Sequence, residues 1–110
     1  MRRWCRERPG ATEETPFGPD ALVYKVAGKM FAVVDPDGRT ATLKCDPQWA
    51  IALRADHAGI MPGYHTNKRH WNTVVLDGSV PSPLVREMLE HAYTLVVDAL
   101  PKRTREGLRT

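Results

Sequence analysis

The sequence lacks the apolar runs that would place a chain of 110 residues in a membrane. No run approaches the roughly 20 residues of a membrane span, and no apolar stretch follows the first charged residues as it does in an export signal. The two cysteines, Cys5 and Cys45, form no CxxC pair. We therefore expect a cytoplasmic protein with no membrane partner, in which both thiols stay reduced and Cys45 is a small buried side chain.

The short motifs of several catalytic and cofactor-binding classes are also missing. The chain has no GxSxG, P-loop or GxGxxG sequence, so it lacks the signatures of common hydrolases and nucleotide-binding proteins. Only two of the four histidines, His65 and His70, lie close in sequence, and their spacing matches no standard zinc pattern. No carboxylate stands beside His65 to support acid or base catalysis. We expect a non-enzymatic protein without a metal or another cofactor.

The composition that is present is typical of a globular domain, with 42% apolar and 26% charged residues. A chain of this length holds one core, so we expect a single domain over residues 1–110. The net charge of +3 is unevenly spread, because residues 1–8 and 101–110 carry +3 each and residues 9–100 carry −3. We expect residues 101–110 to form a solvated basic tail, and the net charge alone is weak evidence for a nucleic-acid partner.

Strand-like composition, rich in Val, Thr, Phe and Tyr, appears in three consecutive segments. They are residues 22–27, 30–35 and 40–45. The turn signals Gly28-Lys29 and Asp35-Pro36-Asp37-Gly38 join them, which predicts an antiparallel meander. Polar and apolar side chains alternate in the third segment, so we expect one buried face and one wet face. The wet face would carry Thr40, Thr42 and Lys44.

Helix signals surround this meander. Residues 1–8 predict a short helix that Pro9-Gly10 stops, and Asp46-Pro47 opens a second helix that extends to about Asp56. Ser82-Pro83 caps the strongest amphipathic helix, which ends before Pro101. Residues 60–70 are expected to be an exposed connection that leads into a strand over residues 71–76. These elements predict a two-layer α+β fold, in which an antiparallel sheet packs against helices and the long helix covers its inner face.

The densest polar and aromatic cluster is residues 64–71, with two cations, two imidazoles and two aromatic rings. Lys and Arg neutralise phosphates and aromatic rings stack on bases, so this composition suits nucleic acid or another phosphorylated ligand. The structural alternative is a solvated loop whose Tyr64 and Trp71 pack inward. Lys29 and Lys44 present the same choice, between an anion-binding surface and ordinary solubilising charge.

Several motifs, taken together and in order, resemble the MmcQ/YjbR family over about residues 9–100. They are Pro9-Gly10-Ala11-Thr12-Glu13, Pro16-Phe17-Gly18, Lys29-Met30-Phe31-Ala32, Leu43-Lys44, and Met61-Pro62-Gly63-Tyr64-His65 with Lys68 and Trp71. The resemblance implies a compact α+β domain, similar in topology to secretion-chaperone-like folds, and family members are described as DNA-binding. The family's first helix is usually longer than the eight residues that precede Pro9 here.

The resemblance makes a non-enzymatic DNA-binding domain the leading functional hypothesis. The site residues that it implies, with Arg69 added because it extends the positive charge, are Lys29, Lys44, Tyr64, His65, Lys68, Arg69 and Trp71. The cations would contact phosphates and the rings would contact sugar or base. Two alternatives stay open: a protein-interaction module that uses the sheet face or edge, and a small-anion or metabolite site where Lys29, Lys44 and His65 converge beneath residues 60–70.

Overall fold

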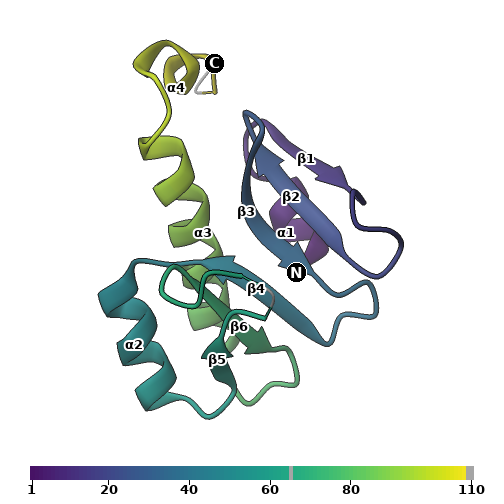
Figure 1. Ribbon diagram of the computed structural model, residues 1–110, viewed down its shortest axis with the longest axis vertical. Coiled ribbons are helices and arrows are strands. Elements are labelled where there is room, and N and C mark those ends of the chain that lie inside the picture. Colours follow the sequence, from purple (N-terminus) through teal and green to yellow (C-terminus); the bar gives the residue numbers. More distant parts are fainter. Residues whose placement is uncertain (65, 109–110) are drawn as a thin grey trace.

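The structure is a computed structural model that describes residues 1–64 and 66–108. These residues form six antiparallel strands and four helices, joined by loops (Figure 1). The sheet and its helices confirm the predicted α+β fold. In chain order the elements are α1 (Arg2–Arg6), β1 (Ala11–Glu14), β2 (Leu22–Val26), β3 (Lys29–Val34), β4 (Thr40–Lys44), α2 (Pro47–Asp56), β5 (Ile60–Pro62), β6 (Trp71–Val75), α3 (Ser82–Asp98) and α4 (Lys102–Leu108).

The strand order in the sheet is β1-β2-β3-β4-β6-β5, and each neighbouring pair is antiparallel. The predicted meander is β2 to β4, and the predicted strand β6 pairs along the whole of β4. The two edge strands, β1 and β5, were not predicted from the sequence. β1 contains Glu13 and Glu14, which are poor strand formers, and β5 is only three residues long and ends in Pro62. Residues 60–70 are therefore an edge strand followed by a loop.

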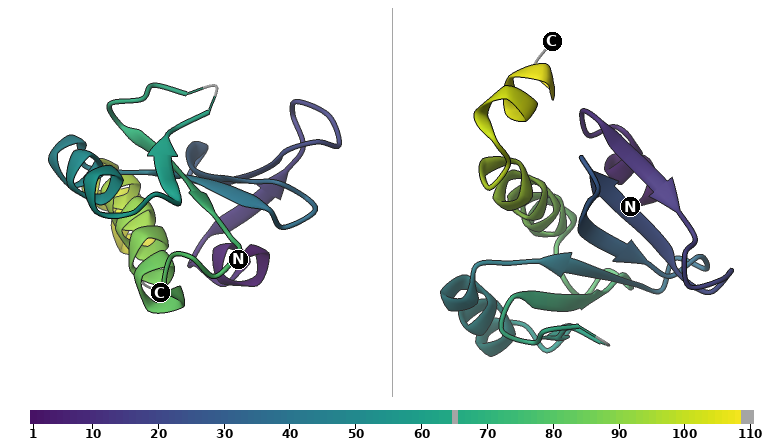
Figure 2. Two further views of the ribbon diagram at one scale, coloured as in Figure 1. Left: turned by 90° about the horizontal axis from the view of Figure 1, so that it is seen from below. Right: turned by 45° about the horizontal axis from the view of Figure 1, so that its top comes forward.

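The inner face of the sheet is the face that α3 and α1 cover (Figure 2). The buried positions of α3, from Val85 to Val96, are the apolar stripe predicted from the sequence. The Tyr93 ring on α3 packs edge-on against Phe31 of β3, with ring centroids 5.5 Å apart. Burial of this stripe against the sheet is the main source of the core.

The helix ends show where local signals operate. The side chain of Asp46 accepts hydrogen bonds from the backbone N–H groups of Gln48 and Trp49, both at 3.1 Å, so the predicted N-cap of α2 is confirmed. Ser82 was predicted to cap α3, but it is the first helical residue and Pro81 occupies the N-cap position without a side-chain hydrogen bond. A proline-rich entry therefore starts this helix through its preset φ angle.

Two surface predictions need correction. Thr42 lies on the outer face as expected but is buried there rather than wet, and its hydroxyl pairs with that of Thr73 on β6 at 2.7 Å. Residues 101–110 were expected to be a solvated tail, but residues 102–108 form the largely exposed helix α4, whose partly buried Leu108 lies against Gly10 and packs on the core. In both cases a partner distant in sequence provides the burial.

Candidate binding groove on the outer sheet face

Two loops, one of residues 15–21 and one of residues 63, 64 and 66–70, rise on the side of the sheet opposite α1 and α3 (Figure 2). Between them lies a groove of about 820 Å³, which we call the outer groove. A volume of this size is in the range of sites that hold a small molecule or several side chains of a partner. Its main lining residues are Phe17, Asp20 and Ala21 on one wall, Met30, Val33, Thr40 and Thr42 on the floor, and Tyr64 and Thr66 on the other wall, with Asp35 at the end of β3.

The floor is set by strand register. Val33 of β3 pairs with Thr42 of β4, and Thr42 pairs with Thr73 of β6, so these three side chains share the outer face. The Thr42 and Thr73 hydroxyls satisfy each other, and Met30 and Val33 add aliphatic carbon to the floor. The floor is therefore apolar although two threonines contribute to it.

The two walls end in exposed aromatic side chains. Phe17 is 74% exposed and Tyr64 is 72% exposed, the largest values among the large hydrophobic residues that the structure describes as exposed. Full burial of a phenylalanine side chain stabilises a protein or a complex by roughly 1.5–3 kcal/mol, and an exposed ring does not contribute this free energy. Two such rings at the lips of one apolar groove form the kind of patch that marks a binding surface.

Hydrogen bonds attach the wall that carries Tyr64 to strand β6. The backbone N–H of Gly63 donates to the carbonyl of Trp71 at 2.9 Å, and the N–H of Tyr64 donates to Thr73 Oγ1 at 3.0 Å. Lys68 Nζ donates to the carbonyl of Gly63 at 3.1 Å and closes the loop on itself. The loop is thus tied to β6 at its start and crosslinked internally.

A buried polar network ties the far end of the same loop to α2. Arg54 Nη1 donates to the carbonyl of Lys68 at 2.9 Å and to Asn72 Oδ1 at 3.0 Å. Asn72 is fully buried, and its Nδ2 donates to the carbonyl of Ala50 at 3.2 Å. Helix α2, strand β6 and the loop therefore position one another through two side chains.

The charge on the described lining of the outer groove is negative. Asp20 and Asp35 both line it, and no Lys or Arg among residues 1–64 and 66–108 does. Asp35 Oδ1 accepts a hydrogen bond from the N–H of Asp37 at 3.2 Å, which holds the carboxylate at the end of β3. A polyphosphate chain would meet two carboxylates on this surface.

The structure brings together only some of the residues predicted as the site. Lys29 begins β3 in the β2–β3 hairpin, and β4 separates β3 from β6, so the hairpin lies apart from the loop that precedes Trp71 (Figure 1). The ring of Trp71 is only 8% exposed, so it packs inward as the structural alternative had it and offers no stacking face. Tyr64 is the one predicted residue that lines the outer groove among those described, and His65 lies outside the described residues.

Three predicted cations do lie near one another. Lys44 on β4 pairs in register with Trp71, and the exposed Lys68 and Arg69 immediately precede that strand. The Lys68 ammonium is already engaged with the loop backbone. The shared anion site of Lys29, Lys44 and His65 stays a prediction, because His65 lies outside the described residues, and neither lysine lines the outer groove.

Sequence reasoning did not select Phe17, Asp20 or Asp35. A signal for Phe17 was present, because an aromatic residue between Pro16 and Gly18 sits where turn residues force an exposed loop. The two aspartates carried no comparable signal. Their common location depends on loop placement, which local sequence does not specify.

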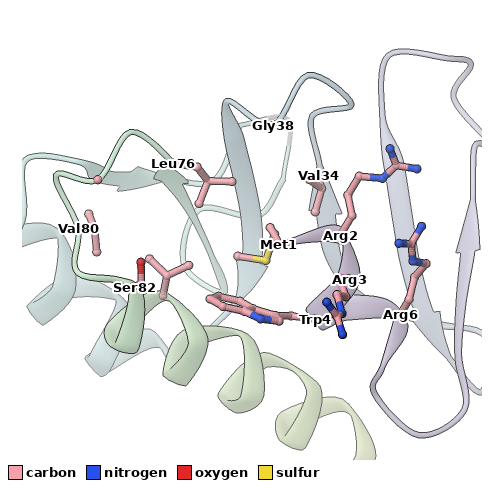
Figure 3. A pocket seen from close by; sticks show the side chains of 12 residues that line it. Met1, Arg2, Arg3, Trp4, Arg6, Val34, Gly38, Leu76, Val80 and Ser82 are labelled. Carbon is pink, nitrogen blue, oxygen red and sulfur yellow. The ribbon is translucent and has the colours of Figure 1, made fainter.

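A second hollow, of about 510 Å³, lies between α1 and the start of α3 (Figure 3). Arg2, Arg3 and Arg6 are on one side of it, and Leu76, Val80 and Ser82 are on the other. Its cations have acidic neighbours: Arg2 and Arg6 lie 3.5 Å and 3.8 Å from Glu13, and Arg3 lies 2.9 Å from Glu7. A hydrogen bond from the Tyr24 hydroxyl further lowers the pKa of Glu13 and favours its charged form. The outer groove is therefore the stronger candidate site.

Residues 1–64 and 66–108 contain neither a metal-ligand cluster nor a membrane-spanning helix. No three His, Cys, Asp or Glu side chains of these residues gather closely enough to hold a metal ion. None of the helices in this part of the chain is long and apolar enough to cross a membrane.

The fold and sequence are similar to those of known proteins. The YjbR family model matches residues 6–95. YjbR of Escherichia coli K12, an uncharacterized protein, is 35% identical over 98% of this chain and 93% of its own length. A Deinococcus radiodurans protein with a DUF419 domain superposes with a TM-score of 0.90 at 41% identity, covering 97% of this chain and 83% of that one. A Pseudomonas syringae protein superposes with a TM-score of 0.73 at 25% identity, covering 84% and 92%. The chain therefore belongs to the YjbR family.

Proposed function

We propose that the chain is a non-catalytic binding protein whose outer groove holds a segment of a partner protein. The observation that carries the proposal is the pair of exposed rings, Phe17 and Tyr64, on opposite walls of an apolar sheet groove. Aromatic residues are enriched at the centres of protein interfaces, where they bury large areas at low entropic cost. The hydrogen bond on the groove floor supports binding over catalysis, because the hydroxyls of Thr42 and Thr73 bond to each other rather than to a base.

The test is selection of peptides on the immobilised chain from a display library, followed by mapping of each selected peptide by amide chemical shifts. We expect shifts at residues 17–21, 30–35 and 64–66, and a loss of affinity of at least about tenfold in the Phe17→Ala/Tyr64→Ala variant. Ile51→Ala is the matched control, since Ile51 is 60% exposed but lies on α2 outside the groove. Peptides that bind elsewhere, or that bind both variants equally, would overturn the proposal.

Nucleic-acid binding is the second candidate function, and a different observation favours it. Lys44, Lys68 and Arg69 lie at one end of the sheet, and none of the three forms an ion pair with a carboxylate among the described residues. Exposed cations beside Tyr64 are suited to a single strand that runs past the groove rather than through it.

Fluorescence anisotropy with labelled single-stranded and duplex DNA tests this candidate at several salt concentrations. Lys68→Ala/Arg69→Ala should lower the slope of log affinity against log salt by about one per phosphate contact removed. Lys29→Ala in the β2–β3 hairpin is the matched control. Removal of residues 102–110 identifies binding that depends only on the basic C-terminal residues. Slopes that are equal in all variants would exclude this candidate.

A further inference from the structure

We infer that the outer groove selects a basic partner segment, in which Lys or Arg side chains alternate with apolar ones. The inference rests on the proposed function, because it names the chemistry of the partner that the groove would hold. It is drawn from the charge of the lining, which the exposed rings by themselves do not determine.

The carboxylates provide the first step. Asp20 stands on the wall formed by residues 15–21, and Asp35 stands at the end of β3 on the floor. Among the described residues neither forms an ion pair, so both charges are available to a partner. Lys25, the cation of the neighbouring strand β2, is paired with Glu14 at 3.5 Å and does not line the groove.

The apolar surfaces provide the second step. The stems of Lys and Arg are hydrocarbon, and such side chains bury their stems while the charged head reaches a polar group. Met30 and Val33 offer the floor for these stems, and the faces of Phe17 and Tyr64 attract cations. An acidic or phosphorylated chain gains neither interaction, and it would be repelled by the two aspartates.

The probes are three labelled ten-residue peptides of alternating sequence: Leu with Arg, Leu with Gln, and Leu with Glu. We expect the Leu/Arg peptide to bind tightest, with amide shifts in the outer groove. The Asp20→Asn/Asp35→Asn variant should weaken it by about 2- to 25-fold, since each of two exposed ion pairs contributes about 1.4- to 5-fold in affinity. Asp56→Asn/Asp98→Asn, which removes the same charge from exposed helix positions, should bind as the unmodified chain does.

The outcomes separate the inference from the proposed function. If the three peptides bind the groove equally, or if Asp20→Asn/Asp35→Asn has no effect while Phe17→Ala/Tyr64→Ala weakens binding, the inference is overturned and the proposed function stands. Equal weakening by the two aspartate variants would mean nonspecific charge attraction and would also overturn the inference. If no peptide, whether alternating or selected by display, shifts groove resonances at about millimolar concentration, both are overturned.

Discussion

At the scale of single residues, Asn72 is the polar side chain on which the site depends most. It is fully buried and bonds to both Arg54 and Ala50. Asn72→Ala removes both hydrogen bonds and leaves buried polar groups without a partner, so we expect the free energy of unfolding to fall by about 2–3 kcal/mol. Urea denaturation measures this loss, with Thr94→Ala on the exposed side of α3 as control. A loss below about 0.5 kcal/mol would mean that the network does not stabilise the fold.

His91 gives the stability a dependence on pH. Its Nε2 accepts a hydrogen bond from the N–H of Asp46 at 3.1 Å, its ring packs edge-on against Trp49, and burial lowers its pKa below the usual 6.5. Below that pH the unfolded chain takes up a proton that the folded chain resists. The stabilisation is therefore complete above about pH 6.5 and is lost as the pH falls through the lowered pKa of the folded state.

The corresponding measurement is urea unfolding at about pH 7.5 and about pH 5.5. We expect the unmodified chain to lose more stability between these values than His91→Gln, which keeps an acceptor but does not titrate. The difference between the two variants isolates His91 from the other titrating groups. An identical pH dependence in both would contradict the assignment.

At the scale of elements, the wall that carries Tyr64 requires a glycine at its first bend. A Cβ atom at Gly63 would lie 2.7 Å from Trp71 Cβ and 3.0 Å from the Trp71 carbonyl oxygen. Gly63→Ala should therefore displace the loop from β6 and destabilise the fold by about 1–3 kcal/mol. Amide exchange should become faster at Gly63 and Tyr64. Gly107→Ala in α4 is the control, because its Cβ would meet no atom within 4 Å. Unchanged exchange in Gly63→Ala would show that the contact is easily relieved.

At the scale of the whole molecule, the two thiols report whether the small N-terminal helix belongs to the same cooperative unit as the sheet. Cys5 on α1 and Cys45 after β4 are both buried in the core cluster, and burial raises their pKa values to about 12 and about 11. We expect both to react with a thiol reagent at least about 1000-fold more slowly than in the denatured chain, because reaction requires opening of the core.

Labelling followed by mass spectrometry of fragments distinguishes the two sites, and the chain in guanidinium chloride supplies the reference rate. Equal protection of both thiols would mean that α1 opens only with the rest of the core. Faster labelling of Cys5 would contradict this and would show that α1 detaches on its own. The short helix is the natural place for such opening, since five residues cannot be stable without packing.

Local sequence determined most of the fold. The strands β2, β3, β4 and β6 and the helices α2 and α3 follow from alternation, turn residues and an apolar stripe, all of which act between neighbours in the chain. The edge strands and α4 could not be predicted in this way, because polar or very short segments such as β1, β5 and α4 gain their order from contact with distant partners.

The candidate site was likewise predicted in part from local sequence and in part only from the tertiary structure. The sequence by itself pointed to residues 64–71 as an aromatic and basic cluster, since composition is a local property. Only the tertiary structure decided that Trp71 is buried, that Lys29 lies elsewhere, and that Phe17 and Asp20 face Tyr64 across one groove. Strand pairing and loop placement bring together side chains more than forty positions apart, and no local pattern encodes that distance.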